Sequence, residues 1–183
     1  APHSLQFQDL TGSLLRVCSA AAVIPPLSAL EIRLCSTFAL LHDVGKRAIP
    51  PEILNKPGSL TKEEFEVMKS HTTQGCKLLE RIPELRECEA FTAICDVCRH
   101  HHERWDGSGY PDRLAGDSIT PWVQVVGMAD AFDALVHPRV YKPAFTQEQA
   151  RDMIVSGACG IFDPLLLACF AQYIGAICQT VYA

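Results

Sequence analysis

Residues 41–71 read LHDVGKRAIPPEILNKPGSLTKEEFEVMKSH, and the pattern in and around this stretch decides the fold class. From Leu27 onward, inward-facing residues recur at helical spacing up to the adjacent pair His42 and Asp43. Gly45 follows two residues later, and a glycine just past the last periodic residue is typical of a helix end. The pattern therefore predicts a helix that carries a histidine and a carboxylate at its end.

The rest of the stretch predicts a loop and then a second helix. Residues 49–60, IPPEILNKPGSL, contain three prolines and one glycine, which is typical of a loop with one short helical turn. Thr61 and Glu64 then form a capping-box pair. We expect the helix that they open to continue to about Arg81, with His71 on its inner face.

The chain downstream is also predicted to be helical. Apolar spacing predicts a helix from about Pro83 to His102, a glycine-rich loop at residues 103–118, and a helix over Pro121–Val136. Thr146–Gln149 begins a short helix, and Pro164 begins an apolar C-terminal one. Because no alternating strand pattern of useful length occurs in the sequence, the predicted fold class is all-α.

The region upstream of Leu27 is harder to interpret. Its first dozen residues are weakly patterned, and Pro25-Pro26 divide an Ala-rich stretch into two short helical pieces. At 183 residues the chain is long enough for one domain with its own core. We therefore expect a single domain with poorly matching N-terminal helices at 1–26, a core at 27–145 and C-terminal helices at 146–183.

Composition limits the class of protein and its ligands. A hydrophobic content of 48% is typical of a globular domain, and the net charge of −5 argues against a surface that binds long nucleic acid. The nine cysteines are an odd number in apolar stretches, so we expect most of them to be reduced and buried. No signal peptide is visible, and the longest apolar run, Leu165–Cys178, is short for a membrane span. A soluble, cytoplasmic domain without membrane insertion is expected.

Six residues of metal-binding types lie on the predicted inner faces and helix ends. Each taken alone is more often a buried histidine or a carboxylate that braces a helix. Together, imidazole and carboxylate groups suit divalent iron, manganese, zinc or nickel, and a carboxylate can bridge two such ions. Their convergence in separate helices of one domain favours a dinuclear metal site. The six residues are His42, Asp43, His71, His101, His102 and Asp130.

Three successive motifs resemble those of a known family. They are the stretch quoted first, HHERWDGSGYP at residues 101–111, and ADAFDALVHPRVYK at residues 129–142. In that order they resemble the signatures of the HD-GYP family, a subgroup of the HD superfamily that hydrolyses the bacterial second messenger cyclic di-GMP. The match is dense from Leu41 to Lys142 and continues loosely to SGACGIFDP at 156–164. It implies an HD-domain helical bundle with extra C-terminal helices and a GYP loop.

The resemblance implies a role for each of the six residues. Asp43 would bridge two metal ions and take part in catalysis. His42 and Asp130 would be the other ligands of the first ion. The second ion would take the three remaining histidines as its ligands: His71, His101 and His102.

Residues around this centre would bind phosphate. Lys46 resembles the family lysine that contacts the scissile phosphate and stabilises its developing charge. Arg139 and Lys142 resemble the basic pair that holds the substrate phosphates, and a guanidinium fork and an ammonium group both suit that task. Asp133 fits a supporting role in which it orients a ligand histidine or fixes a helix.

Gly109, Tyr110 and Pro111 resemble the GYP loop that names the family. The resemblance implies that this loop is partly structural and partly a binding surface for partners such as diguanylate cyclase domains, and that Tyr110 contributes to substrate binding. It leaves open whether the domain forms a homodimer.

One departure from the family lies upstream. The family histidine of a His-x-x-Arg-Val element falls at Ser13, because Arg16-Val17 match the end of that element. A metal-binding glutamate of trinuclear members falls at Asp9. The serine therefore puts a third ion in doubt.

The sequence thus predicts a metal-dependent phosphodiesterase in which a metal-bound hydroxide attacks a phosphorus of cyclic di-GMP, giving pGpG and leaving open a second hydrolysis to GMP. Two ions are expected, iron or manganese first, with zinc or nickel also compatible. The alternative is a degenerate, non-catalytic cyclic di-GMP receptor or protein-interaction scaffold, which the departure at Ser13 favours. A third hypothesis is a phosphohydrolase of the wider HD superfamily that acts on another nucleotide. The KPGSLT and GYP segments argue against it.

Overall fold

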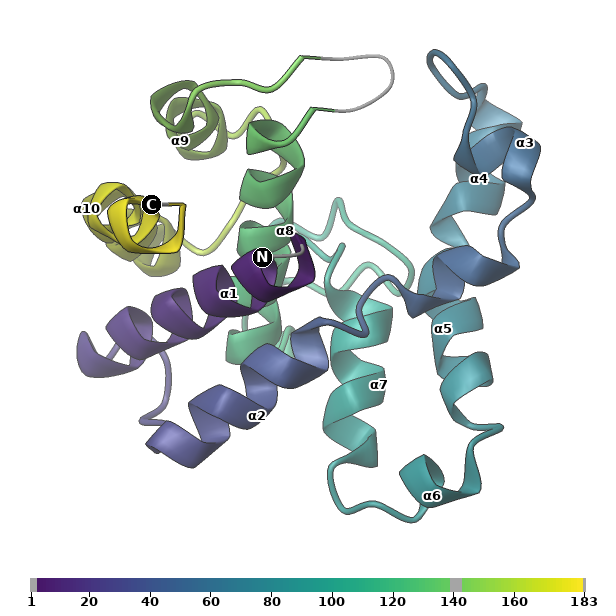
Figure 1. Cartoon of the computed structure of the whole chain (residues 1–183), viewed down its shortest axis with the longest axis horizontal. Helices are drawn as coiled ribbons and strands as arrows, with labels where there is room; N and C mark the ends of the chain where they lie inside the picture. Colours follow the sequence, from purple (N-terminus) through teal and green to yellow (C-terminus); the bar gives the residue numbers. More distant parts are fainter. Residues whose placement is uncertain (1–2, 139–142, 183) are drawn as a thin grey trace.

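The computed structural model describes residues 3–138 and 143–182, and both ranges consist of helices and loops without a strand (Figure 1). The predicted all-α class is therefore confirmed. The helices are α1 (His3–Ala20), α2 (Ala29–Ala39), the 3-10 helix η1 (Val44–Ala48), α3 (Pro51–Leu54), α4 (Lys62–Lys69), α5 (His71–Leu79), α6 (Pro83–Arg86), α7 (Phe91–His100), the 3-10 helix η2 (Gly116–Ser118), α8 (Pro121–Val136), α9 (Gln147–Val155) and α10 (Pro164–Val181).

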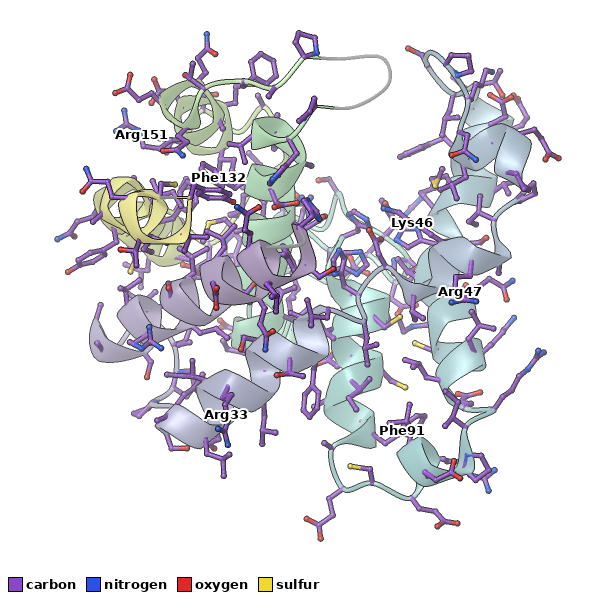
Figure 2. All side chains as sticks on the ribbon, viewed as in Figure 1. Arg33, Lys46, Arg47, Phe91, Phe132 and Arg151 are labelled. Carbon is purple, nitrogen blue, oxygen red and sulfur yellow. The ribbon has the colours of Figure 1, made fainter. Side chains whose placement is uncertain are left out.

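Helix α8, whose bounds match the prediction, forms the centre of the core. It is apolar around most of its circumference, as expected of a helix surrounded by protein, and α1, α7 and α9 pack against it. Phe132 points from α8 toward α10, where its ring lies 5.7 Å from that of Phe170 between centroids (Figure 2). Asp130 is therefore carried by a helix that other helices enclose. The fully buried apolar side chains of α8 are Val123, Val125, Val126, Met128, Ala129 and Phe132.

A smaller apolar cluster lies between α5 and α7. These helices run side by side, with α6 in the connection between their ends (Figure 1). Cys76 and Leu79 of α5 are buried against Ile94 and Cys98 of α7. Phe38 of α2 packs against both this cluster and the main core, so it connects the two apolar clusters.

The N-terminal region differs most from the sequence prediction. Residues His3–Ala20 form one 18-residue helix, where the sequence suggested weak patterning and two short pieces. Its residues Leu10, Leu14, Leu15 and Cys18 are completely buried against α2, α8 and α10. Their helical spacing is hidden in the sequence because the other face of α1 is also largely uncharged. The boundaries proposed within the single domain stay a prediction, but α1 is part of its main core.

Capping residues set several helix starts. The capping boxes predicted at Thr61 and at Thr146 are both present. A third occurs at Ser28, close to Leu27, where the sequence predicted the start of a helix but no capping box. The helix begun at Thr61 bends at Ser70 and ends at Leu79, so the single helix expected to Arg81 is two shorter ones.

The helix predicted from Pro83 to His102 is also wrong in its first half. Only Pro83–Arg86 are helical there, residues 87–90 form turns, and α7 begins at Phe91. The turns at residues 87–90 separate α6 from α7 within the connection between α5 and α7 (Figure 1). The helical spacing of apolar residues corresponds to an observed helix only from Phe91 onward.

Helix α10 is, within the described ranges, the one helix long and apolar enough to cross a membrane by length and composition. Leu166, Phe170 and Ile174 on one of its faces are buried, and it packs against α1 and α9. A core helix of a globular domain shows the same length, composition and packing. Five cysteines of the described helices are buried thiols: Cys18, Cys76, Cys98, Cys169 and Cys178.

Candidate metal centre

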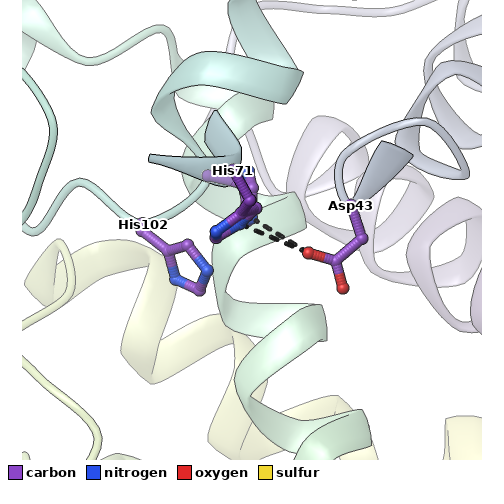
Figure 3. A group of neighbouring side chains, drawn as sticks. Asp43, His71 and His102 are labelled. Carbon is purple, nitrogen blue, oxygen red and sulfur yellow. Dashed lines mark hydrogen bonds and ion pairs between the residues drawn. The ribbon is translucent and has the colours of Figure 1, made fainter. Parts of the chain in front are cut away.

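The six residues of metal-binding type converge from four parts of the chain. His42 and Asp43 lie in the turn between α2 and η1, and His71 is the first residue of α5. His101 and His102 directly follow α7, and Asp130 lies within α8. Their potential ligand atoms form two groups, each within 4.8 Å, which share one histidine; Figure 3 shows part of the first. The groups are Asp43, His71, His101 and His102, and His42, His101 and Asp130.

The orientation of three histidine rings is fixed by the main chain. The Nδ1 atoms of His42, His71 and His101 lie 2.6, 2.7 and 3.0 Å from carbonyl oxygens three or four residues earlier in the chain. A carbonyl oxygen can only accept, so each Nδ1 carries a hydrogen and donates it. The Nε2 atom of each neutral ring is then left with its lone pair facing the centre, which is how metal-binding histidines are commonly held.

The centre contains groups that a cation would satisfy. Asp43 Oδ1 lies 3.4 Å from His71 Nε2 and 3.9 Å from His101 Nε2, and it is buried without a hydrogen-bond partner. The two Nε2 atoms lie 3.5 Å apart and, with hydrogens on both Nδ1 atoms, present two lone pairs to each other. A buried carboxylate oxygen among such lone pairs fits a divalent cation.

On the other side of the centre, His42 joins the two carboxylates. Its Nε2 lies 3.3 Å from Asp43 Oδ2 and 3.6 Å from Asp130 Oδ1. Asp43 thus directs one oxygen toward each of the two groups of ligand atoms. That is the arrangement needed from a carboxylate that bridges two ions.

Burial controls the charges of the rings. It lowers the pKa of His71 and His101, and it lowers the pKa of His102 to about 3, so these rings are neutral at neutral pH and able to bind a metal. Burial also acts to lower the pKa of His42, but hydrogen bonds to Asp130 and Asp43 outweigh it and raise this pKa to about 10. In the absence of metal, His42 therefore carries a proton where a cation could bind.

The predicted phosphate-binding residues are described only in part. Lys46 Nζ lies 2.5 Å from Asp43 Oδ2 at the edge of the centre, and its side chain is about one-third exposed (32%). Its neighbour Arg47 is exposed on the surface (Figure 2). Arg139 and Lys142 lie outside the described residues.

The GYP loop is packed behind His102. The Tyr110 ring stacks on the His102 ring with centroids 4.7 Å apart, and its main-chain N–H donates to the His102 carbonyl. Gly109 lies so close to this main chain that a Cβ there would overlap it. Glu103 braces the loop from inside, since its carboxylate accepts hydrogen bonds from the amides of Asp112 and Leu114. The cis peptide bond in the loop joins Tyr110 to Pro111.

Asp133 lies beside the six residues but pairs with others. Its Oδ2 is 2.8 Å from His3 Nε2, and its Oδ1 is 3.2 Å from His137 Nδ1. Sequence reasoning gave neither histidine a role. The separation of four between Asp133 and His137 was a usable signal, whereas His3 comes from a helix whose position no local pattern predicts.

Two pockets bear on the prediction. One of about 350 Å³ opens on the centre and is lined by apolar Phe7 and Leu40 together with His42, Asp43 and Asp130. Another of about 520 Å³ lies between α1, α2 and the end of α10. Asp9, Ser13 and Arg16 line this second pocket, so Asp9 does not line the pocket at the centre.

The chain is similar to known proteins over most of its length. An HD domain model matches residues 4–166. A cyclic di-GMP phosphodiesterase from Vibrio cholerae is 40% identical over 92% of this chain and 35% of its own length. A 3'3'-cGAMP-specific phosphodiesterase 2 from the same organism is 36% identical over 85% of this chain and 29% of its own length. The chain thus spans about a third of the length of these relatives.

A solved structure supports the fold. The HDG"Y"P protein Bd1817 from Bdellovibrio bacteriovorus superposes with a TM-score of 0.69 over 94% of this chain and 51% of that one, at 17% identity. The resemblance found in the three sequence motifs is confirmed, and the chain belongs to the HD domain family.

Proposed function

We propose that this chain is the catalytic part of a metal-dependent phosphodiesterase that hydrolyses cyclic di-GMP to pGpG, with GMP as the product of any second hydrolysis. The observation that carries the proposal is the buried, unpartnered Oδ1 of Asp43 among the Nε2 atoms of two neutral histidines. The names of the curated relatives, which include cyclic di-GMP phosphodiesterases, supply the substrate class.

Two divalent ions, iron or manganese first and zinc or nickel as alternatives, fit the mixed nitrogen and oxygen donors. Asp43 is the proposed bridge, with His42 and Asp130 on one side and His71, His101 and His102 on the other. Such a pair would supply Lewis acidity and an activated water for phosphodiester hydrolysis.

The chain's own residues would bind and orient the substrate. The pocket of about 350 Å³ gives a phosphodiester access to Asp43 and Asp130, with Phe7 and Leu40 as an apolar wall for the attached nucleoside. Lys46, which now pairs with Asp43, would turn its ammonium group to the scissile phosphate and stabilise the charge that develops there. Arg139 and Lys142 are proposed to hold the other phosphate.

The surroundings of the domain are proposed from the same resemblance. We place it in the cytoplasm, where cyclic di-GMP is made and used, with the GYP loop as a docking surface for diguanylate cyclase domains. Ser108, Gly109, Tyr110 and Pro111 of this loop line an open pocket of about 410 Å³ together with residues of α4 and α5.

A second candidate function is a non-catalytic cyclic di-GMP receptor. The observation that favours it is that α1 brings an apolar Phe7 ring within 4.9 Å of the His42 ring, while Ser13 lines a different pocket. A receptor would bind the nucleotide with the same residues and release no product.

The experiment is to purify the protein anaerobically, measure bound metal, and follow cyclic di-GMP and 3'3'-cGAMP by chromatography. Conversion of cyclic di-GMP to pGpG by protein loaded with iron or manganese is the expected result. Tight nucleotide binding without product from fully loaded protein would reject the enzyme and support the receptor.

A further inference from the structure

Arg104 is a partly buried cation two residues after His102. Burial lowers the pKa of its guanidinium, against the attraction of Asp130. A guanidinium has hydrogen-bond donors only and stays protonated, so Arg104 is not a metal ligand. A guanidinium held beside a metal centre without binding the metal requires another explanation.

The contacts of Arg104 are main-chain carbonyls from two separate parts of the chain. Nη1 donates to the carbonyls of His101 and Glu103, at 3.3 and 2.9 Å, and Nε donates to the carbonyl of Cys159, at 3.2 Å. The guanidinium also lies over the Phe162 ring, 4.9 Å from its centroid. Arg104 therefore connects the end of α7 with residues 156–163, which join α9 to α10.

The backbone around Arg104 is shaped for these contacts. A Cβ at Gly160 would overlap the Arg104 side chain, and Gly160 has a φ of +98°, which favours glycine. A Cβ at Gly127 of α8 would overlap the His101 carbonyl, the same oxygen that accepts from Arg104. The His101 main chain thus lies between Gly127 of α8 and the Arg104 guanidinium. Gly127 is one helical turn before Asp130.

We propose that Arg104 is a positioning residue that sets the main chain of His101 and His102 relative to Asp130. This proposal rests on the proposed function in one respect: it takes His101, His102 and Asp130 to be metal ligands. Two of the three carbonyls that it binds belong to the segment carrying the ligands, and the third belongs to the C-terminal connection. Arg104 therefore couples the α9–α10 region to the geometry of the centre.

The test uses Co²⁺ titration of the metal-free protein, followed by visible absorption, with variants R104M and R104K. Loss of the fork in R104M is expected to weaken Co²⁺ binding by roughly 10–100-fold and to change the absorption bands, as is typical when support of a ligand histidine is lost. R104K keeps the charge but not the planar fork, and we expect an intermediate affinity.

The matched control is R99M, which removes a partly exposed guanidinium at the end of α7 and its ion pair with Asp112, the residue after Pro111 of the GYP loop. We expect its Co²⁺ affinity and spectrum to match the unchanged protein. R104M and R104K proteins that both melt cooperatively and bind Co²⁺ with unchanged affinity would overturn the proposal. If R104M does not fold, unchanged affinity and spectrum in R104K alone overturn it.

Turnover distinguishes this proposal from the proposed function. With cyclic di-GMP we expect R104M to lower kcat and leave KM unchanged, because Arg104 is not among the residues lining the pocket at the centre. Weakened Co²⁺ binding in R104M, with no turnover by the unchanged protein, would leave the positioning role intact and reject only the phosphodiesterase.

Discussion

Gly45 lies directly against the main-chain carbonyl of His71, so closely that a Cβ at Gly45 would overlap that oxygen and the amide of Gly75. Gly45 follows Asp43 by two residues, and His71 begins α5. Backbone contact between η1 and α5 therefore sets the 3.4 Å approach of the Asp43 carboxylate to the His71 ring. Gly45 thus helps to shape the candidate centre although it carries no group that could bind a metal.

Replacing Gly45 with alanine is expected to lower the free energy of unfolding by about 1–3 kcal/mol, because the backbones must separate to admit the methyl group. The same separation moves Asp43 away from His71, so we also expect loss of Co²⁺ binding. Denaturant unfolding and Co²⁺ titration measure the two effects. The control is G175A in α10, where a Cβ meets no neighbour; it should be neutral or stabilising by up to about 1 kcal/mol. Wild-type affinity in G45A would contradict this role for Gly45.

Lys46 is expected to act on turnover and not on metal content. The variant K46M should keep two bound ions and lose roughly 10²–10³-fold in kcat, because one group that stabilises developing charge is removed. Metal analysis and product chromatography on the same sample separate these effects. R47M, at an exposed neighbouring position, is the control and should retain full turnover. Equal losses in K46M and R47M would speak against a specific role for Lys46.

Tyr110 should matter through its ring more than through its hydroxyl. In Y110F the stack on His102 is kept, and we expect metal affinity within about threefold of wild type. In Y110A the His102 ring loses this contact, and affinity should fall by roughly tenfold or more. Co²⁺ titration of both variants decides between the two contributions. If Y110F is as impaired as Y110A, the hydroxyl carries the effect.

Metal binding should release a proton from His42. Its pKa of about 10 in the metal-free centre means that the ring is protonated at pH 7.5, and a metal must displace that proton. We expect release of about one proton per chain at pH 7.5, measured by calorimetry in buffers of different ionisation enthalpy. The release should fall to about half a proton per chain at pH 10 and disappear above that pH. Proton release that is constant from pH 7 to pH 10 would be the opposite result.

The same raised pKa predicts a pH dependence for the stability of the metal-free protein. His42 binds its proton more tightly when folded, so its contribution is fully present below pH 6.5 and is lost as the pH rises through about 10. Unfolding in the presence of a chelator should therefore require less denaturant at pH 10 than at pH 7. A variant H42Q should lose most of this difference.

The sequence predicted those parts of the centre that local pattern determines. His42, Asp43, His71, His101, His102 and Asp130 lie at predicted helix ends or on inner faces, and the structure brings all six together. The capping pairs at Thr61 and Thr146 are present because a side chain and a backbone amide three residues apart satisfy each other locally.

What the sequence did not predict depends on packing between distant segments. The position of α1 follows from burial of Leu10 and Leu14 against α8 and α10, and only this packing brings His3 to Asp133. Arg104 binds carbonyls up to 55 residues away, a contact that no spacing reveals. The contacts of Arg139 and Lys142 stay a prediction.

The central claim is a centre of two ions bridged by Asp43. Its most direct test is to titrate the metal-free protein anaerobically with Mn²⁺ while following cyclic di-GMP turnover, with D43N as the paired variant. We expect turnover to reach its maximum at two equivalents of Mn²⁺ per chain, and D43N to bind fewer ions and form no product. Full turnover at one equivalent, or a D43N protein that binds two ions and remains active, would contradict the account.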